Sequence, residues 1–168
     1  MRYLSYIVLL LAGVVVQVGV LRFASVKSVA PDLLLLATVV VGLRSGQIPG
    51  MVFGFLAGLA IDLVTATLVG PSALSKTVVG FIAGLWHGYT VSLSKNASLL
   101  VLFVCVSLHE LLMAAVQLLA PGANFGFVLL RWTLPRAIYS LALGMVLFLL
   151  LPHKVWRARA TPLFRGRA

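Results

Sequence analysis

Residues 50–84 decide the fold and read G-M-V-F-G-F-L-A-G-L-A-I-D-L-V-T-A-T-L-V-G-P-S-A-L-S-K-T-V-V-G-F-I-A-G. A nearly unbroken apolar run precedes the dipeptide Gly70-Pro71, and a second apolar run follows it. Gly-Pro marks a turn, and a helix needs about 20 apolar residues to cross a bilayer. We therefore predict two antiparallel transmembrane helices, over residues 50–69 and 72–91.

The composition of the whole chain agrees with a lipid environment. Of 168 residues, 62% are hydrophobic and 10% are charged, whereas a soluble domain is about 45–50% apolar and about 25% charged. Thirteen Lys and Arg residues outweigh three acids. The basic residues fall singly or in pairs between apolar runs, which is typical of membrane-protein loops and not of a nucleic-acid-binding patch.

Four further apolar runs have helical length, and backbone groups in lipid must be satisfied within helices. These runs cover residues 3–21, 29–43, 98–119 and 133–151, and the second of them is short for a complete span. The first is too long for a signal-peptide core, so we expect it to be retained. Residues 44–49 are predicted to be a turn.

The predicted fold class is therefore an all-α integral membrane protein with a six-transmembrane-helix bundle over residues 1–152. A basic tail follows over residues 153–168. Six spans place both termini on one side, and that side would hold eight basic residues against three on the other. Basic loops stay in the cytoplasm, so both termini are predicted to be cytoplasmic.

Three acids lie in or beside the apolar runs, where a charge is costly and normally pairs inside the bundle. Asp62 and Lys76 each lie roughly 8–12 Å from the Gly70-Pro71 turn at 1.5 Å per residue, so an ion pair between them is predicted. Its role is open between structural support and a proton or substrate site. Arg136 is the best-placed partner for Glu110. Asp32, after Pro31, is interpreted first as a helix start and second as a binding residue.

Small residues recur at four-residue intervals on both halves of the hairpin, which places each set on one helix face. Such faces let helix backbones approach closely, either against each other or against another helix. The two sets are Gly50, Gly54 and Gly58, and Gly80, Gly84 and Gly88.

The sequence contains no pattern that indicates catalysis or a cofactor. We find no nucleophile–base arrangement and no phosphate-binding loop. His109 and Glu110 are adjacent, point about 100° apart on a helix, and lack further ligands one turn away, which disfavours a zinc site. The lone Cys105 cannot form an intrachain disulfide. We therefore expect a non-enzymatic protein without metal or cofactor.

The hairpin resembles that of the rod shape-determining protein MreD family. The similarity rests on P-D-L-L-L from Pro31, G-M-V-F-G-F-L-A-G-L-A-I-D-L from Gly50, and L-V-G-P-S-A-L-S-K-T-V-V-G-F-I-A-G from Leu68, and it covers roughly residues 29–90. The matching positions are Pro31, Asp32, Gly54, Gly58, Asp62, Gly70 and Lys76.

This resemblance implies a non-catalytic inner-membrane subunit of the bacterial rod complex, or elongasome. Such a subunit supports cell shape and lateral peptidoglycan synthesis. It would bind the bitopic protein MreC and, through it, MreB and the peptidoglycan synthases. The resemblance also implies a bundle similar to the S-component of energy-coupling-factor transporters.

Two further readings stay open. One is the substrate-binding subunit of a vitamin-type transporter, and the other is assembly as a homo-oligomer. The transporter reading is weakened by the few polar residues available to line a pocket, since ligand pockets use several placed polar groups. Those residues are Gln17, Asp62, Lys76, His109, Glu110 and Gln117.

Overall fold

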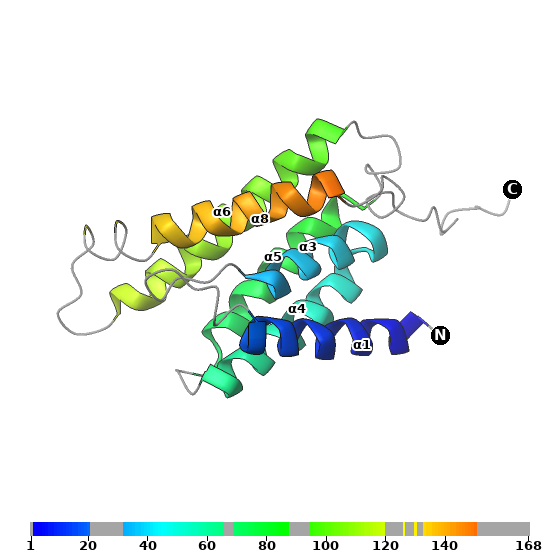
Figure 1. Cartoon of the computed structure of the whole chain (residues 1–168), viewed down its shortest axis with the longest axis horizontal. Coiled ribbons are helices and arrows are strands. Elements are labelled where there is room, and N and C mark those ends of the chain that lie inside the picture. The colour runs from blue at the N-terminus through cyan, green and yellow to red at the C-terminus, as the bar shows by residue number, and fades with distance from the viewer. Residues whose placement is uncertain are drawn as a thin grey trace, which may run out of the picture.

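The computed structural model describes residues 2–20, 32–65, 69–87, 95–119, 126, 130 and 133–150, and the regular elements within these residues are helices. Figure 1 shows their arrangement. The helices are α1 (Arg2–Val15), the π-helical turn η1 (Val16–Val20), α3 (Leu33–Ser45), α4 (Gln47–Thr65), α5 (Pro71–Leu85), α6 (Lys95–Leu118) and α8 (Leu134–Leu150). The all-helical class predicted from the sequence is confirmed for this part of the chain.

Successive helices run in alternating directions (Figure 1). The first residues of α1, α4 and α6 and the last residues of α3, α5 and α8 consequently lie at the same end of the bundle. Helix α1 packs against α3 and α4, whereas α6 packs against α5, α8 and α3. Helix α3 therefore lies between the two sides of the molecule.

Helix α3 is the centre of the bundle because its sequence, L-L-L-L-A-T-V-V-V-G-L, is apolar on every face. A helix that is hydrophobic all round is buried. One side of α3 joins residues of α5 and α6 in a core, and the other side joins α1 and α4. Buried α3 side chains in these two cores include Leu35, Val39 and Leu43 on the first and Leu34 and Val41 on the second.

The turn between α3 and α4 is shorter than predicted. Residues 44–49 were expected to form the turn, but α3 continues to Ser45 and α4 begins at Gln47. The reversal takes place at Gly46, whose φ of 95° is a left-handed conformation that glycine adopts without penalty. Pro49 lies in the first turn of α4, where its missing N–H costs nothing.

The two glycine faces pack against each other across the α4–α5 hairpin. A Cβ added at Gly50 would lie 2.5 Å from the carbonyl oxygen of Gly80, and one added at Gly84 would lie 2.5 Å from the backbone nitrogen of Gln47. Gly54 likewise faces the backbone of Lys76. The sequence left open whether the glycine faces pack against each other or against another helix, and the structure has both, because Gly50 and Gly54 also lie close to α3. Gly88 lies outside the described residues.

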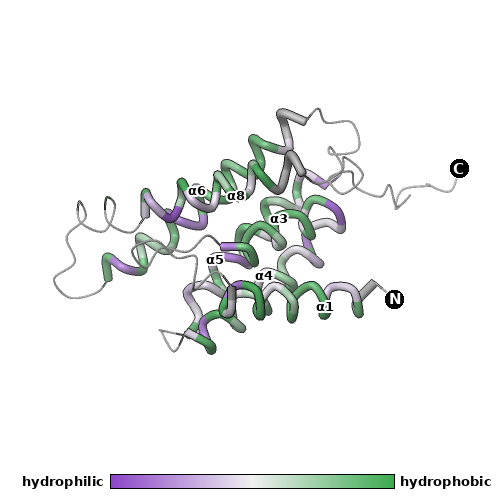
Figure 2. Tube along the Cα trace, in the orientation of Figure 1, coloured by the Kyte–Doolittle hydropathy of each residue, from purple (hydrophilic) through white to green (hydrophobic). Residues whose placement is uncertain are grey.

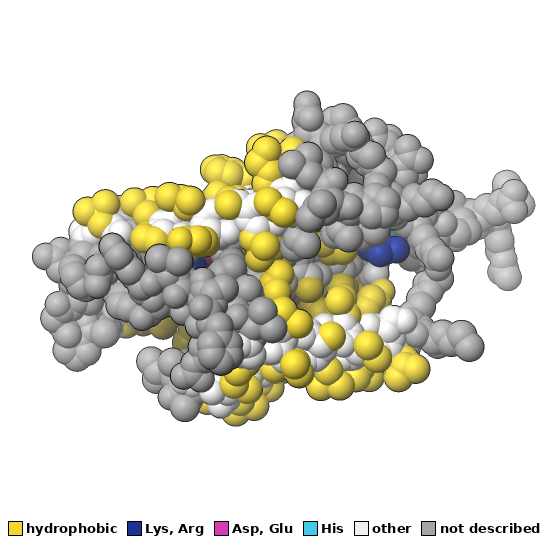
Figure 3. Space-filling model, in the orientation of Figure 1, with side chains coloured by type: hydrophobic (Ala, Val, Ile, Leu, Met, Phe, Trp, Pro, Cys, Tyr) yellow, Lys and Arg dark blue, Asp and Glu magenta, His cyan; other side chains and the backbone are white. Residues whose placement is uncertain are grey.

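The outward helix faces are apolar. Figure 2 shows helices that are hydrophobic along most of their length, and the described surface in Figure 3 is covered largely by hydrophobic side chains. Two helices, Gln47–Thr65 and Ser98–Leu118, are long and apolar enough to cross a membrane, and only 33% and 39% of them is buried in the structure. The core helix of a soluble protein would be mostly buried, so these two favour a membrane environment. The remaining apolar helices are shorter, and six complete spans stay a prediction.

Candidate functional site: a buried polar cluster

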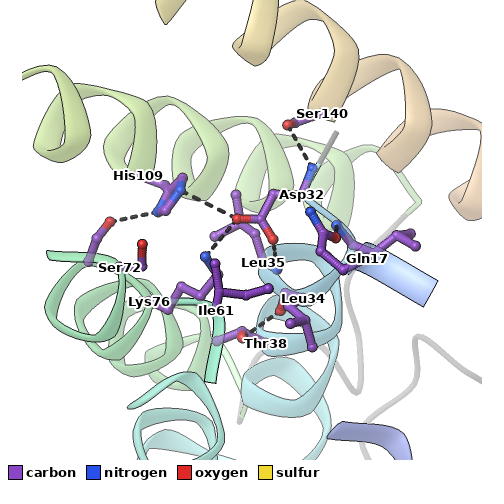
Figure 4. A network of polar contacts seen from close by, with 12 residues as sticks. Gln17, Asp32, Leu34, Leu35, Thr38, Ile61, Ser72, Lys76, His109 and Ser140 are labelled. Carbon is purple, nitrogen blue, oxygen red and sulfur yellow. Dashed lines mark hydrogen bonds and ion pairs between the residues drawn. The ribbon is translucent and has the colours of Figure 1, made fainter. Parts of the chain in front are cut away.

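Several buried polar groups contact Asp32, the residue that precedes α3 (Figure 4). The sequence predicted a helix start here with Asp32 in the first turn; in the structure Asp32 is the N-cap, one position before the helix, and its Oδ1 accepts a hydrogen bond of 2.8 Å from the Leu35 backbone N–H. Its Oδ2 lies 2.6 Å from Nζ of Lys76 on α5. The Lys76 side chain is 1% exposed, so this is an ion pair inside the bundle. Asp32 thus begins one helix and anchors a second.

The predicted ion pair between Asp62 and Lys76 is wrong. Asp62 Oδ2 instead accepts hydrogen bonds from the backbone N–H groups at the start of α5, at 2.9 Å from Gly70, 3.1 Å from Ser72 and 3.3 Å from Ala73. The first amides of a helix lack intrahelical acceptors, and a carboxylate there is favoured by the helix dipole as well. Asp62 therefore caps α5.

The error has a geometric cause. Equal depth was inferred from similar sequence distances to Gly70-Pro71, whereas the contacts across the hairpin set a different register. Gly58 faces the backbone of Ser72 and Ala73, and Gly54 faces Lys76. Lys76 therefore lies at the level of Gly54, which is eight residues before Asp62 on α4, or about 12 Å at 1.5 Å per residue. Asp62 lies level with the turn and Lys76 lies two helical turns below it.

Helix α6 joins the cluster through His109, which is 2% exposed. Its Nδ1 lies 2.6 Å from Oγ of Ser75 on α5, and its Nε2 lies 3.6 Å from Oδ2 of Asp32. From the sequence, His109 was an improbable metal ligand and one of the few polar residues for a transporter pocket, and Ser75 was not singled out. The spacing of Ser75 and Lys76 carries no signal for either contact, because both depend on how α5 and α6 cross.

The start of α3 is also held by two elements that are distant in sequence. The Leu33 backbone N–H donates to Oε1 of Gln17 in η1 at 2.8 Å, and the Asp32 backbone N–H donates to Oγ of Ser140 on α8 at 3.4 Å. Ser140 is fully buried. The cluster consequently connects η1, α3, α5, α6 and α8.

Glu110 is buried apart from these contacts. It is 3% exposed, and among the described residues its Oε1 has no hydrogen-bond partner. Arg136 of α8 lies within electrostatic range, but no ion pair within 4.0 Å joins the two side chains among the described residues. The pairing predicted from the sequence is therefore not formed in this structure.

Ser75, His109 and Asp32 have the residue types of a hydrolytic triad without its geometry. The Asp32–His109 separation of 3.6 Å is too long for a hydrogen bond, and the Asp32 carboxylate is engaged by Lys76. Ser75 is 1% exposed, so a substrate carbonyl could not reach its hydroxyl in this arrangement. Within the described residues no three His, Cys, Asp or Glu side chains could hold a metal ion. The geometry of the cluster suits helix–helix cohesion.

No curated protein and no solved structure matches the chain. A family model described as rod shape-determining protein MreD matches residues 1–153 of the 168. Because this match spans almost the whole chain, including every described element, the protein belongs to the rod shape-determining protein MreD family.

Proposed function

We propose that this rod-shape-determining membrane protein acts as a non-catalytic subunit of the rod complex and binds a bitopic membrane partner of the MreC type. The proposal rests on one feature above all, which is the inward direction of its polar groups. Asp32, Lys76 and His109 contact one another inside the bundle. The outward faces carry apolar side chains such as Leu11, at 58% exposed, and Leu111, at 64% exposed.

Such a molecule suits recognition by helix packing. In lipid, transmembrane helices associate through van der Waals contact and a few interhelical hydrogen bonds. Internal cohesion through the polar cluster would keep the outward faces in a constant shape, which pre-organises them for a partner helix. In this role the subunit supports lateral peptidoglycan synthesis through its partner, which connects it to MreB and the peptidoglycan synthases.

The proposal includes a location and a topology. We place the chain in the bacterial inner membrane with six spans over residues 1–152, both termini and the basic tail of residues 153–168 in the cytoplasm, and an architecture similar to the S-component. The alternating helix directions support this topology. Homo-oligomers are compatible with the same apolar faces.

The transporter-subunit alternative receives less support from the geometry. A ligand pocket needs polar groups that face the ligand. Asp62 is bound to three backbone amides, and Lys76 is bound to Asp32. The polar residues that the sequence offered for a pocket are thus largely engaged within the protein.

Two experiments test the proposal. The tagged chain is solubilised from native membranes in mild detergent and its partners are identified; we expect recovery of the MreC-type protein, and recovery without it or any wall-synthesis protein would contradict the proposal. The gene is also depleted in a rod-shaped host, where rounding that the wild-type chain reverses is expected. Rods that keep their shape but lose uptake of a nutrient would favour the transporter alternative.

A further inference from the structure

The three acids of this chain have very different surroundings. Asp62 accepts three backbone hydrogen bonds. Asp32 faces the Lys76 ammonium and accepts a backbone hydrogen bond from Leu35. Glu110 is 3% exposed, and its Oε1 meets no donor among the described residues. Asp62 and Asp32 therefore have partners that stabilise a negatively charged carboxylate, whereas the Oε1 of Glu110 has none among the described residues.

The charged groups around Glu110 do not make up for the missing hydrogen-bond donor at its Oε1. Helix α6 packs against α3, α5 and α8. Asp32 at the start of α3, Lys76 on α5 and Arg136 on α8 lie within electrostatic range of Glu110, and His109 precedes it on α6. Lys76 is already paired with Asp32 at 2.6 Å. Arg136 does not approach within 4.0 Å among the described contacts. An ionised carboxylate held away from water without a partner costs several kcal/mol or more, whereas a neutral carboxyl group costs far less.

We propose that Glu110 is a proton-binding site in the membrane interior and that its proton controls contact between α6 and α8. In the arrangement described here the Glu110 carboxyl group carries the proton and is neutral. When the proton leaves for water, the carboxylate draws the Arg136 guanidinium into an ion pair. Helix α8 then moves against α6. This inference goes beyond the proposed function and does not depend on the identity of any partner.

The geometry of α8 suits such a movement. Helix α8 packs against α6 and α3, and its Ser140 accepts a long hydrogen bond of 3.4 Å from the Asp32 N–H. Arg136 and Ser140 are four residues apart on the same helix, so they lie on one face. A shift that brings Arg136 to Glu110 would therefore also change the contact at the start of α3.

The first test uses the fact that Glu110 is the single glutamate among the three acids of the chain. Glutamate labelled with ¹³C at the side-chain carboxyl reports this one site in the full-length protein, reconstituted in lipid nanodiscs. At mildly acidic pH we expect the resonance of a protonated carboxyl group, which moves to the carboxylate position as the pH is raised. Glu110→Gln removes the signal and confirms the assignment. A carboxylate resonance at neutral pH and below would overturn the proposal.

The second test measures the movement. Spin labels are placed at exposed positions of the two helices with Leu111→Cys and Ile138→Cys, in a Cys105→Ala background that removes the buried native thiol. We expect the distance between the labels to change as the pH rises through the transition seen at Glu110. Glu110→Gln, which stays neutral, and Arg136→Gln, which removes the partner, should each abolish the change. A distance that shifts equally in Glu110→Gln would refute the role of the proton, even if the carboxyl group titrates.

Discussion

The Asp32 side chain both caps its own helix and pairs with a charge on another helix. Its Oδ1 satisfies an amide at the start of α3, and its Oδ2 neutralises Lys76 of α5. The pair is nearly sealed from solvent, since the two side chains are 14% and 1% exposed. Loss of either partner would leave the other charge without compensation inside the bundle.

The first prediction concerns this pair. Asp32→Asn or Lys76→Met should lower the free energy of unfolding by about 3–5 kcal/mol, because each leaves one buried charge unpaired. The double variant Asp32→Asn with Lys76→Met should recover part of that loss. Unfolding of the purified protein in detergent, analysed as a double-mutant cycle, measures the coupling.

A second double-mutant cycle, between Asp62 and Lys76, tests whether Asp32 or Asp62 is the partner of Lys76. Because Asp62 and Lys76 share no contact, Asp62→Asn and Lys76→Met should act additively to within about 0.3–0.5 kcal/mol. A coupling larger than that between Asp62 and Lys76, with none between Asp32 and Lys76, would show that the pairing described here is incorrect.

A second prediction at this scale concerns the cap of α5. Asp62→Ala should lower the free energy of unfolding by about 0.5–2 kcal/mol, the usual cost of losing a side-chain cap. Asp62→Asn keeps an acceptor oxygen and should cost less. Hydrogen exchange at the Ser72 and Ala73 amides locates the effect, and unchanged protection of these amides in Asp62→Ala would contradict the capping role.

At the scale of elements, the α4–α5 hairpin is held by backbone contact across its glycines. The helices approach so closely that a Cβ at Gly50 would clash with the carbonyl oxygen of Gly80. This closeness has no equivalent at the π-helical turn η1, where a Cβ at Gly19 would meet nothing within 4 Å. The two sites form a matched pair for testing the packing.

We predict that Gly54→Ala destabilises the protein and Gly19→Ala does not. A methyl group at Gly54 would press on the backbone of Lys76, and overpacking of this kind costs about 1–3 kcal/mol. Gly19→Ala should stay within about 1 kcal/mol of the wild type, because only helix propensity changes. Thermal unfolding in detergent compares the two, and equal stability of both variants would contradict close packing of the hairpin.

At the scale of the whole molecule, apolar helix faces point outward while the polar cluster joins η1, α3, α5, α6 and α8 from within. This inversion of the soluble pattern fits a membrane protein of the MreD family. Because the helices alternate in direction, each turn between them lies at one end of the bundle (Figure 1). The membrane topology can therefore be tested separately at each turn.

We predict that Gln47, the first residue of α4, and Val69, two residues before α5, lie on opposite sides of the membrane. Both are exposed, and the one native cysteine is buried, so Gln47→Cys and Val69→Cys can be labelled against a low background. The Arg44 turn is expected to be cytoplasmic. A membrane-impermeant thiol reagent added to intact spheroplasts should therefore label Val69→Cys and spare Gln47→Cys. The reverse pattern would invert the proposed orientation.

The sequence alone determined that the chain is an all-helical membrane protein. Apolar runs of helical length and basic residues between them can be recognised without knowing which residues contact one another in the fold. It also identified the helix start at Asp32, since a cap is a contact between near neighbours. The sequence also predicted close packing of the two glycine sets, and packing of one set against the other was one of the two arrangements that it allowed.

Only the tertiary structure decided which charges meet. Asp62 was assigned to Lys76 because their distances from Gly70-Pro71 looked equal, yet the register of the hairpin places Gly54 beside Lys76 and Asp62 beside the first amides of α5. Lys76 instead meets Asp32, and His109 meets Ser75, through helix crossings that no local pattern encodes. Interhelical contacts depend on where each helix ends and how its neighbours rotate, and a displacement of one helical turn is enough to exchange one partner for another.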